Sequence, residues 1–142
     1  MCIRDSVKLA LVLRTKPFFR ETTNLPRVTI RSGAFPRTFA NRNALVRTTP
    51  SVNGVKTGRT SGAGYVLVGS ASRRGVTVLA AVLGDQSESA RNADTLALLR
   101  YGLRRYSRKA AVRSGRRLAR AGLRYRDASV ALVAGRTAAL RL

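Results

Sequence analysis

Residues 52–84 of the chain read VNGVKTGRTSGAGYVLVGSASRRGVTVLAAVLG. Two runs within this stretch, residues 63–71 and 76–83, are rich in apolar and β-branched side chains, and Ser72-Arg73-Arg74-Gly75 separates them. Two such runs joined by a short connection with glycine predict an antiparallel hairpin. Both runs are apolar at most positions, so we expect the sheet to be covered on both faces. Helices must then pack against it.

A helix is predicted to follow the second run. Asp85 and Glu88 have the spacing of a capping box, in which the aspartate accepts amide hydrogens at the helix start. Apolar side chains then recur at helical spacing, at Ala90, Ala93, Leu96, Ala97, Leu99, Tyr101 and Leu103. Further upstream, Val7–Leu13 is an apolar run closed by Pro17 and predicts the end of a buried helix, whereas Arg27–Ile30 predicts a short strand. These elements together indicate the α+β class.

The length of 142 residues suits one domain, or one domain and the start of a second. The composition changes after Tyr106, because residues 107–142 hold many basic side chains, a single acid, Asp127, and β-like runs at 129–134 and 138–142. We therefore expect a boundary near Ser107. Residues 1–6 resemble a translated sequencing adapter and are set aside. The expected organisation is residues 7–106 as one part and residues 107–142 as the next.

The net charge of +22 arises from 28 basic and 6 acidic side chains. A charge this large attracts polyanions such as nucleic acid, anionic lipid or anionic wall polymer, although a GC-rich genome also favours arginine codons. The arginines are spread through every segment and only 6% of residues are aromatic. No helix-turn-helix, RNA-binding or zinc-finger motif is present. The pattern predicts non-specific polyanion binding that weakens with salt, and no specific nucleic acid partner.

Histidine and cysteine, which often serve as catalytic residues or metal ligands, are scarce in this sequence. Histidine is absent, which excludes a Ser-His-Asp or Cys-His arrangement and most zinc sites within these residues. Cys2 is the single cysteine, which excludes an intramolecular disulfide and a thiolate metal cluster. The sequence therefore predicts no metal site.

Lys56-Thr57-Gly58 is the motif with the clearest chemical meaning. Lys56 supplies a fixed positive charge, Thr57 a hydroxyl donor, and Gly58 lets a substrate backbone approach the strand. Together they suit a peptide with a free carboxylate that lies antiparallel to an edge strand. A strand that simply ends in a turn is the alternative interpretation.

The string from Asn53 to Val68 resembles the Lys-Thr-Gly region of the low-molecular-mass penicillin-binding proteins. These are the serine-type D-alanyl-D-alanine carboxypeptidases of peptidase family S11. Asn43-Ala44-Leu45, residues 78–84 and residues 90–102 resemble further stretches of that family, so the resemblance covers about residues 7–106. It implies a β-lactamase-like transpeptidase fold, here as a partial domain with an antiparallel sheet and covering helices. Residues 113–116 resemble the opening of the small β-rich domain that follows in many members.

The resemblance also implies a role for each residue of the motif. In the family a serine attacks the penultimate D-Ala carbonyl, the terminal D-Ala leaves, and water hydrolyses the acyl-enzyme. Lys56 would supply positive potential, Thr57 would hydrogen-bond the substrate carboxylate, and Gly58 would leave room for the substrate. The backbone amide of Arg59, where family members commonly carry histidine, would be one oxyanion-hole donor. Arg91 aligns with an arginine near the carboxylate pocket, and a structural salt bridge at a helix start explains it equally well.

The nucleophile of the family is missing from this sequence. No serine is followed three residues later by lysine. Ser51-Val52-Asn53 matches Ser-x-Asn in letters but lies directly before Lys56, where the family has a turn, so we interpret Ser51 as a turn residue. We therefore expect a fragment that is inactive by itself. A non-catalytic module that binds peptidoglycan or polyanions, including nucleic acid, is the alternative.

The resemblance implies partners and a location for the full-length protein. Its partners would be peptidoglycan stem peptides and β-lactams, with non-specific attraction to anionic wall polymers or lipid. Because this substrate lies outside the cytoplasm, the protein would be exported to the periplasm or the cell surface by a signal upstream of these residues. Serine acyl chemistry requires no metal and no organic cofactor.

Overall fold

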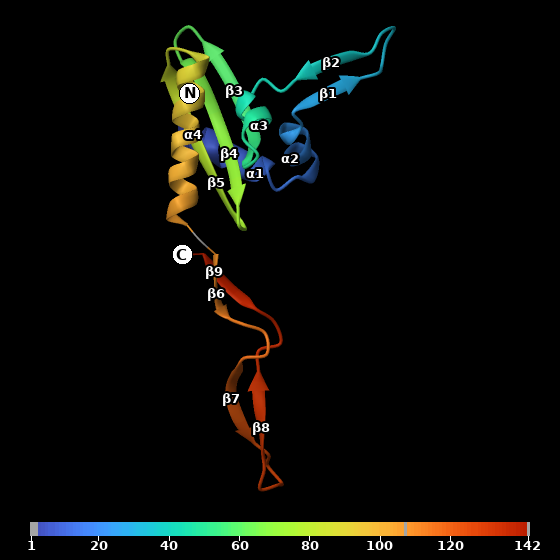
Figure 1. Ribbon diagram of the computed structural model, residues 1–142, viewed down its shortest axis with the longest axis vertical. Helices are drawn as coiled ribbons and strands as arrows, with labels where there is room; N and C mark the ends of the chain where they lie inside the picture. The colour runs from blue at the N-terminus through green and yellow to red at the C-terminus, as the bar shows by residue number, and fades with distance from the viewer. Residues whose placement is uncertain (1–2, 107, 142) are drawn as a thin grey trace. The chain divides into compact units, whose positions relative to one another are not determined.

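The structure is a computed structural model that describes residues 3–106 and 108–141. It forms two compact units, Met1–Arg105 and Tyr106–Leu142, and each is described by itself (Figure 1). Cys2 and Ser107, which the sequence analysis singled out, lie outside the described residues.

A three-stranded antiparallel sheet forms the centre of the first unit. Its order is β3 (Val52–Thr60), β4 (Gly64–Arg73) and β5 (Val76–Asp85). The β4–β5 hairpin confirms the predicted pairing, and its two loop residues, Arg74 and Gly75, both have positive φ, at 50° and 76°. Positive φ at both positions is what the twist-matched type I′ hairpin turn requires, and glycine adopts it without strain.

Both faces of the sheet are covered, as the apolar runs predicted. On one face, the helix α4 (Glu88–Arg105) packs against β4 and β5 and shares a core with α3 (Ala44–Thr48). The buried members of that core are Leu45, Val52, Leu67, Ala71 and Leu99. On the other face, α1 (Ile3–Leu13) and α2 (Pro17–Asn24) contribute Ala10 and Phe19 to a second core with Val55 and Val68 (Figure 1). Side chains of β4 alternate between the two cores.

The helix α4 begins two residues later than a cap at Asp85 would place it. Asp85 is the last residue of β5, and the hydroxyl of Ser87 accepts a hydrogen bond from the amide of Ala90 at 3.1 Å. Ser87 is therefore the N-cap residue, and the predicted capping box was wrong. Asp85 pairs with Tyr65 and so remains in the sheet, although aspartate is locally favoured at a helix N-cap.

The helix α1 is less buried than its apolar run predicted. It includes Ile3 to Ser6, which the sequence analysis set aside, and only Ala10 is fully buried. Leu9, Leu11 and Val12 are each more than half exposed. The expectation of a buried helix was wrong because α1 contacts the sheet along one narrow face.

A second hairpin lies between α2 and α3. The predicted strand is confirmed as β1 (Arg27–Ile30), and it pairs antiparallel with β2 (Arg37–Ala40), which the sequence analysis did not identify. All eight of these strand residues are exposed. Strands this short and solvated lack the apolar alternation that makes a strand visible in a sequence.

The second unit consists of two antiparallel strand pairs. β6 (Arg108–Val112) pairs with β9 (Ala138–Arg141), and β7 (Arg117–Gly122) pairs with β8 (Ser129–Val133). Both β-like runs predicted in this region are therefore strands. Among all helices of the described residues, none combines the length and apolar character needed to cross a bilayer.

We predict that Gly69→Ala destabilises the first unit, because β4 and α4 approach each other closely at this position. A Cβ on Gly69 would lie 2.6 Å from Thr95 Cγ2 and 3.3 Å from Leu99 Cδ1. Overpacking of this kind costs about 1–3 kcal/mol of unfolding free energy. Urea unfolding followed by circular dichroism measures it. Gly62→Ala is the matched control, since a Cβ there meets nothing within 4 Å; equal midpoints for both variants would contradict the prediction.

Candidate active-site cleft

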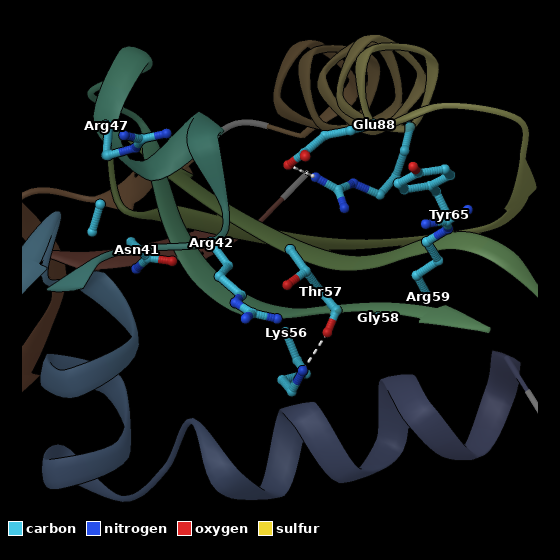
Figure 2. A pocket seen from close by; sticks show the side chains of 11 residues that line it. Asn41, Arg42, Arg47, Lys56, Thr57, Gly58, Arg59, Tyr65 and Glu88 are labelled. Atoms are coloured by element: carbon cyan, nitrogen blue, oxygen red, sulfur yellow. Dashed lines mark hydrogen bonds and ion pairs between the residues drawn. The ribbon is translucent and has the colours of Figure 1, made fainter.

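A cleft of about 710 Å³ opens beside β3, between the α3 region and the start of α4 (Figure 2). The structure brings every residue that the sequence analysis assigned to the site into its lining, namely Lys56, Thr57, Gly58, Arg59 and Arg91. Five more lining residues carry polar or aromatic groups that the sequence analysis did not assign to the site: Asn41, Arg42, Arg47, Tyr65 and Glu88. The loop after β2, the helix α3 and the helix α4 supply side chains to the same cleft as the Lys-Thr-Gly strand.

The strand β3 lies at one edge of its sheet, and no strand of the described residues pairs with its outer side. Near its start, side chains satisfy two carbonyl groups. Arg14 Nη1 donates to the carbonyl of Asn53 at 2.8 Å, and Asn43 Nδ2 donates to the carbonyl of Gly54 at 3.1 Å. The stretch that begins at Lys56 is therefore the part of this edge that a peptide could extend.

Lys56 and Thr57 project from opposite faces of β3, as successive strand residues do. Figure 2 shows Lys56 directed toward the side on which α1 lies, with its Nζ donating to the carbonyl of Thr57. That contact shows that the carbonyl of Thr57 points away from β4. Alternate residues of an antiparallel strand direct their backbone groups the same way, so the amide and carbonyl of Arg59 also point outward.

Gly58 is not needed for the internal packing of the sheet. A Cβ at this position would meet only Val66 Cβ, at 3.8 Å, and the backbone of Gly58 is not in the left-handed region. A Cβ here would lie on the same face of β3 as Lys56, beside the apolar hollow that Gly58 and Val66 line together with residues of α1.

Arg91 lies in the wall of the cleft and is 3% exposed. Its Nη2 lies 2.7 Å from Oε1 of Glu88, and its Nη2 and Nε donate to Oδ1 of Asn92 at 2.8 and 3.2 Å. The guanidinium is therefore both next to the cleft and engaged in a salt bridge at the start of α4. The salt bridge at a helix start, which the sequence analysis gave as the alternative role of Arg91, is therefore present in the structure.

The cleft is strongly cationic. Five basic side chains line it, Arg42, Arg47, Lys56, Arg59 and Arg91, against one acid, Glu88, which is already paired with Arg91. The arrangement favours an anionic ligand. The Asn41-Arg42-Asn43 segment is polar in the sequence, but only the fold shows that Arg42 and Arg47 line the same cleft as Lys56. Elsewhere in residues 3–106 and 108–141, no three acidic, histidine or cysteine side chains gather where they could hold a metal ion.

The family model described as D-alanyl-D-alanine carboxypeptidase matches residues 4–87. The chain belongs to this family. It is 34% identical over 91 residues to the D-alanyl-D-alanine carboxypeptidase DacD of Escherichia coli (strain K12), an alignment that covers 63% of this chain and 24% of the relative. The chain thus spans about a quarter of the length of that curated carboxypeptidase.

Solved structures of similar proteins have the same fold. A mutant of the Streptomyces K15 DD-transpeptidase matches with a TM-score of 0.68 and 31% identity over 73% of this chain and 42% of its own. Penicillin-Binding Protein D2 of Listeria monocytogenes, in its cefotaxime-bound form, matches with a TM-score of 0.58 and 34% identity over 66% of this chain and 36% of its own. The α+β, transpeptidase-like fold and the family resemblance predicted from the sequence are both confirmed.

We predict that Asn43→Ala destabilises the first unit. Asn43 is 3% exposed; its Oδ1 accepts the amide of Leu45 at 3.2 Å to cap α3, and its Nδ2 donates to the carbonyl of Gly54. Loss of the side chain leaves a buried carbonyl without its donor and should cost about 1–3 kcal/mol of unfolding free energy. Urea denaturation provides the measurement. The same substitution at the exposed Asn24 is the control, and a matching loss at both sites would refute the role of Asn43.

We predict that Asp85→Asn stabilises the first unit at neutral pH. Burial raises the pKa of Asp85, the charge of Asp94 and a hydrogen bond with it raise the pKa further, and Arg91 acts in the opposite direction. A raised pKa means that the folded state binds this proton more tightly than the unfolded chain. Stability is then lost as the pH rises through the folded pKa, and the asparagine variant avoids this loss.

The advantage of Asp85→Asn should disappear in acid, once the carboxyl is protonated in both states. Thermal unfolding of the wild-type chain and the variant at neutral pH and at about pH 3 compares the two conditions. Glu21→Gln, an exposed neutralisation of the same charge, serves as the control. A gain in stability that persists unchanged in acid would show that the pKa of Asp85 is not its cause.

Proposed function

We propose that this chain is the substrate-binding part of a serine-type D-Ala-D-Ala carboxypeptidase, which removes the terminal D-Ala from peptidoglycan stem peptides through an acyl-enzyme. One observation carries the proposal: the Lys-Thr-Gly stretch lies on the outer edge of β3, in the wall of a cationic cleft. Membership of the carboxypeptidase family supports the reaction class.

The geometry suggests how the peptide binds. A stem peptide would add antiparallel to β3, with its penultimate residue opposite Arg59 and its terminal carboxylate close to Thr57. The hydroxyl of Thr57 would donate to the terminal carboxylate, and the charge of Lys56 would favour that carboxylate. The outward amide of Arg59 would stabilise the oxyanion that develops on the penultimate carbonyl. Arg91 would line the carboxylate pocket and add positive potential. Its guanidinium would keep donating hydrogen bonds to Glu88 and Asn92.

The serine nucleophile and the Ser-x-Asn motif of the reaction would come from residues outside this sequence. Ser51 does not line the cleft, and its carbonyl accepts the amide of Ser72 at 2.8 Å beside the first residue of β3. This position supports a structural role for Ser51. The 142 residues would therefore bind the substrate without hydrolysing it.

The partners and location of the whole protein follow from the same proposal. The full-length enzyme would act on stem peptides and react with β-lactams. It would be exported to the periplasm or to the cell surface. The Listeria relative in its cefotaxime-bound form supports the β-lactam partner. The exposed arginines would add non-specific attraction to anionic wall polymers or lipid.

Calorimetric titration with two peptides tests the proposal. Acetyl-Lys(acetyl)-D-Ala-D-Ala with a free carboxylate should bind about tenfold more tightly than its C-terminal amide, because a hydrogen bond to a charged group is worth about 1.5–3 kcal/mol. Thr57→Val should remove most of this preference, and Lys56→Gln should reduce it. Thr48→Val, the same substitution at an exposed threonine that does not line the cleft, is the matched control.

Equal affinity for the carboxylate and the amide would contradict the proposal. Sequence-selective binding of a short oligonucleotide that persists at high salt would favour the alternative of a basic nucleic-acid-binding module. The spread of arginine through every segment argues against that selectivity.

A further inference from the structure

The second unit concentrates positive charge more strongly than the first. Residues 106–142 hold ten basic side chains against one acid, Asp127, whereas residues 1–105 hold eighteen against five. Clusters of about four to eight Lys and Arg side chains are typical of segments that bind anionic lipid. Charge alone, however, attracts any polyanion, so the kind of partner depends on what accompanies the charge.

The loop that joins β7 to β8 carries an exposed aromatic ring between two arginines. Tyr125 is 88% exposed, and Arg124 and Arg126 are its neighbours in the sequence. The amide of Leu123 donates to the carbonyl of Ala128 at 2.9 Å and closes the loop at the end of the strand pair (Figure 1). The guanidinium carbon of Arg124 lies 5.7 Å from the centre of the Tyr125 ring. The loop therefore presents a ring and two cations to the same partner.

This combination distinguishes Tyr125 from the other exposed aromatic side chains. Phe18 and Phe35 are also more than three-quarters exposed, but neither has an arginine as a sequence neighbour. Leu123, in the same loop as Tyr125, is also exposed to solvent. A soluble anionic polymer would be held by charge alone, whereas a ring and a leucine gain free energy only where they leave water for an apolar medium.

A lipid bilayer with anionic headgroups offers both interactions at one surface. Tyrosine prefers the boundary between lipid and water, where its ring contacts acyl chains and its hydroxyl stays hydrated. The guanidinium groups on either side can bind headgroup phosphates through paired hydrogen bonds. We propose that the β7–β8 loop docks on an anionic lipid bilayer, with the ring of Tyr125 inserted at the level of the headgroups. This inference does not depend on the proposed function, since the loop belongs to the second unit and the Lys-Thr-Gly cleft to the first.

A fluorescent reporter at the loop tests the insertion directly. The chain contains no tryptophan, so Tyr125→Trp places a single indole at this position of the 142-residue protein. Vesicles of phosphatidylcholine mixed with phosphatidylglycerol should shift its emission to shorter wavelength, because the indole leaves water for the interface. Vesicles of phosphatidylcholine alone should leave the emission unchanged, because they carry no net negative charge.

Two reporters in the first unit are the matched controls. Tyr101 is 53% exposed on α4 and lies 5.2 Å from the guanidinium carbon of Arg105, so Tyr101→Trp places the indole beside an arginine outside the loop. Phe35→Trp places it in the loop between β1 and β2. Neither emission should shift with the mixed vesicles. A shift at either position as large as that at Tyr125 would overturn the assignment to the β7–β8 loop.

Co-sedimentation with the mixed vesicles measures what each group contributes to binding. Tyr125→Ser should weaken the binding about fivefold, because the apolar surface of the ring is lost from the interface. Arg124→Gln combined with Arg126→Gln should weaken it at least about tenfold, because each cation near an anionic surface adds attraction. Tyr101→Ser should leave the binding unchanged.

Soluble polyphosphate separates insertion into lipid from attraction to charge. The wild-type chain and Tyr125→Ser should bind it equally well, since a soluble polyanion offers the ring no apolar medium. Equal vesicle binding by these two proteins, with unshifted emission from Tyr125→Trp, would overturn the proposal in favour of an anionic polymer held by charge. An equal loss of vesicle and polyphosphate binding in Tyr125→Ser would overturn it as well.

Discussion

The burial of β4 on both faces is the constraint on which the rest of the first unit depends. Every residue from Val66 to Ala71 is buried, and Leu67 is completely inaccessible to solvent. A strand in this position needs hydrogen-bonding partners on both sides and apolar cover above and below. β3 and β5 provide the hydrogen-bonding partners, and the helices provide the apolar cover.

This central strand also determines the geometry of the cleft. Pairing with β4 leaves the opposite side of β3 as an edge and directs Thr57 and Arg59 to the same face. The packing of α4 on β4, at the close approach allowed by Gly69, brings Glu88 and Arg91 to the cleft. Asn43 connects α3 to the start of β3 by bonding the carbonyl of Gly54, so Arg42 and Arg47 reach the same cavity. Residues nearly fifty positions apart thus share one site.

Where a feature depends on local patterning, it could be predicted from the sequence. The hairpin of β4 and β5 follows from two apolar runs around a glycine turn, and the position of Lys56, Thr57 and Gly58 next to an apolar strand was visible in the same stretch. Predictions failed where a contact distant in sequence overrides a local preference. Asp85 is suited to cap a helix, yet its pairing with Tyr65 keeps it in β5 and leaves the cap to Ser87.

The sequence by itself determined the class of fold, the strand that carries Lys-Thr-Gly, and the family, because these depend on patterns of neighbouring residues. Tertiary structure alone decided which other side chains surround that strand. The cationic surplus of the cleft and the stacking of Arg59 on Tyr65 arise from segments that meet only when β3 pairs with β4 and the helices cover the sheet. Electrostatic and stacking interactions depend on distance in space, and sequence separation does not reveal that distance.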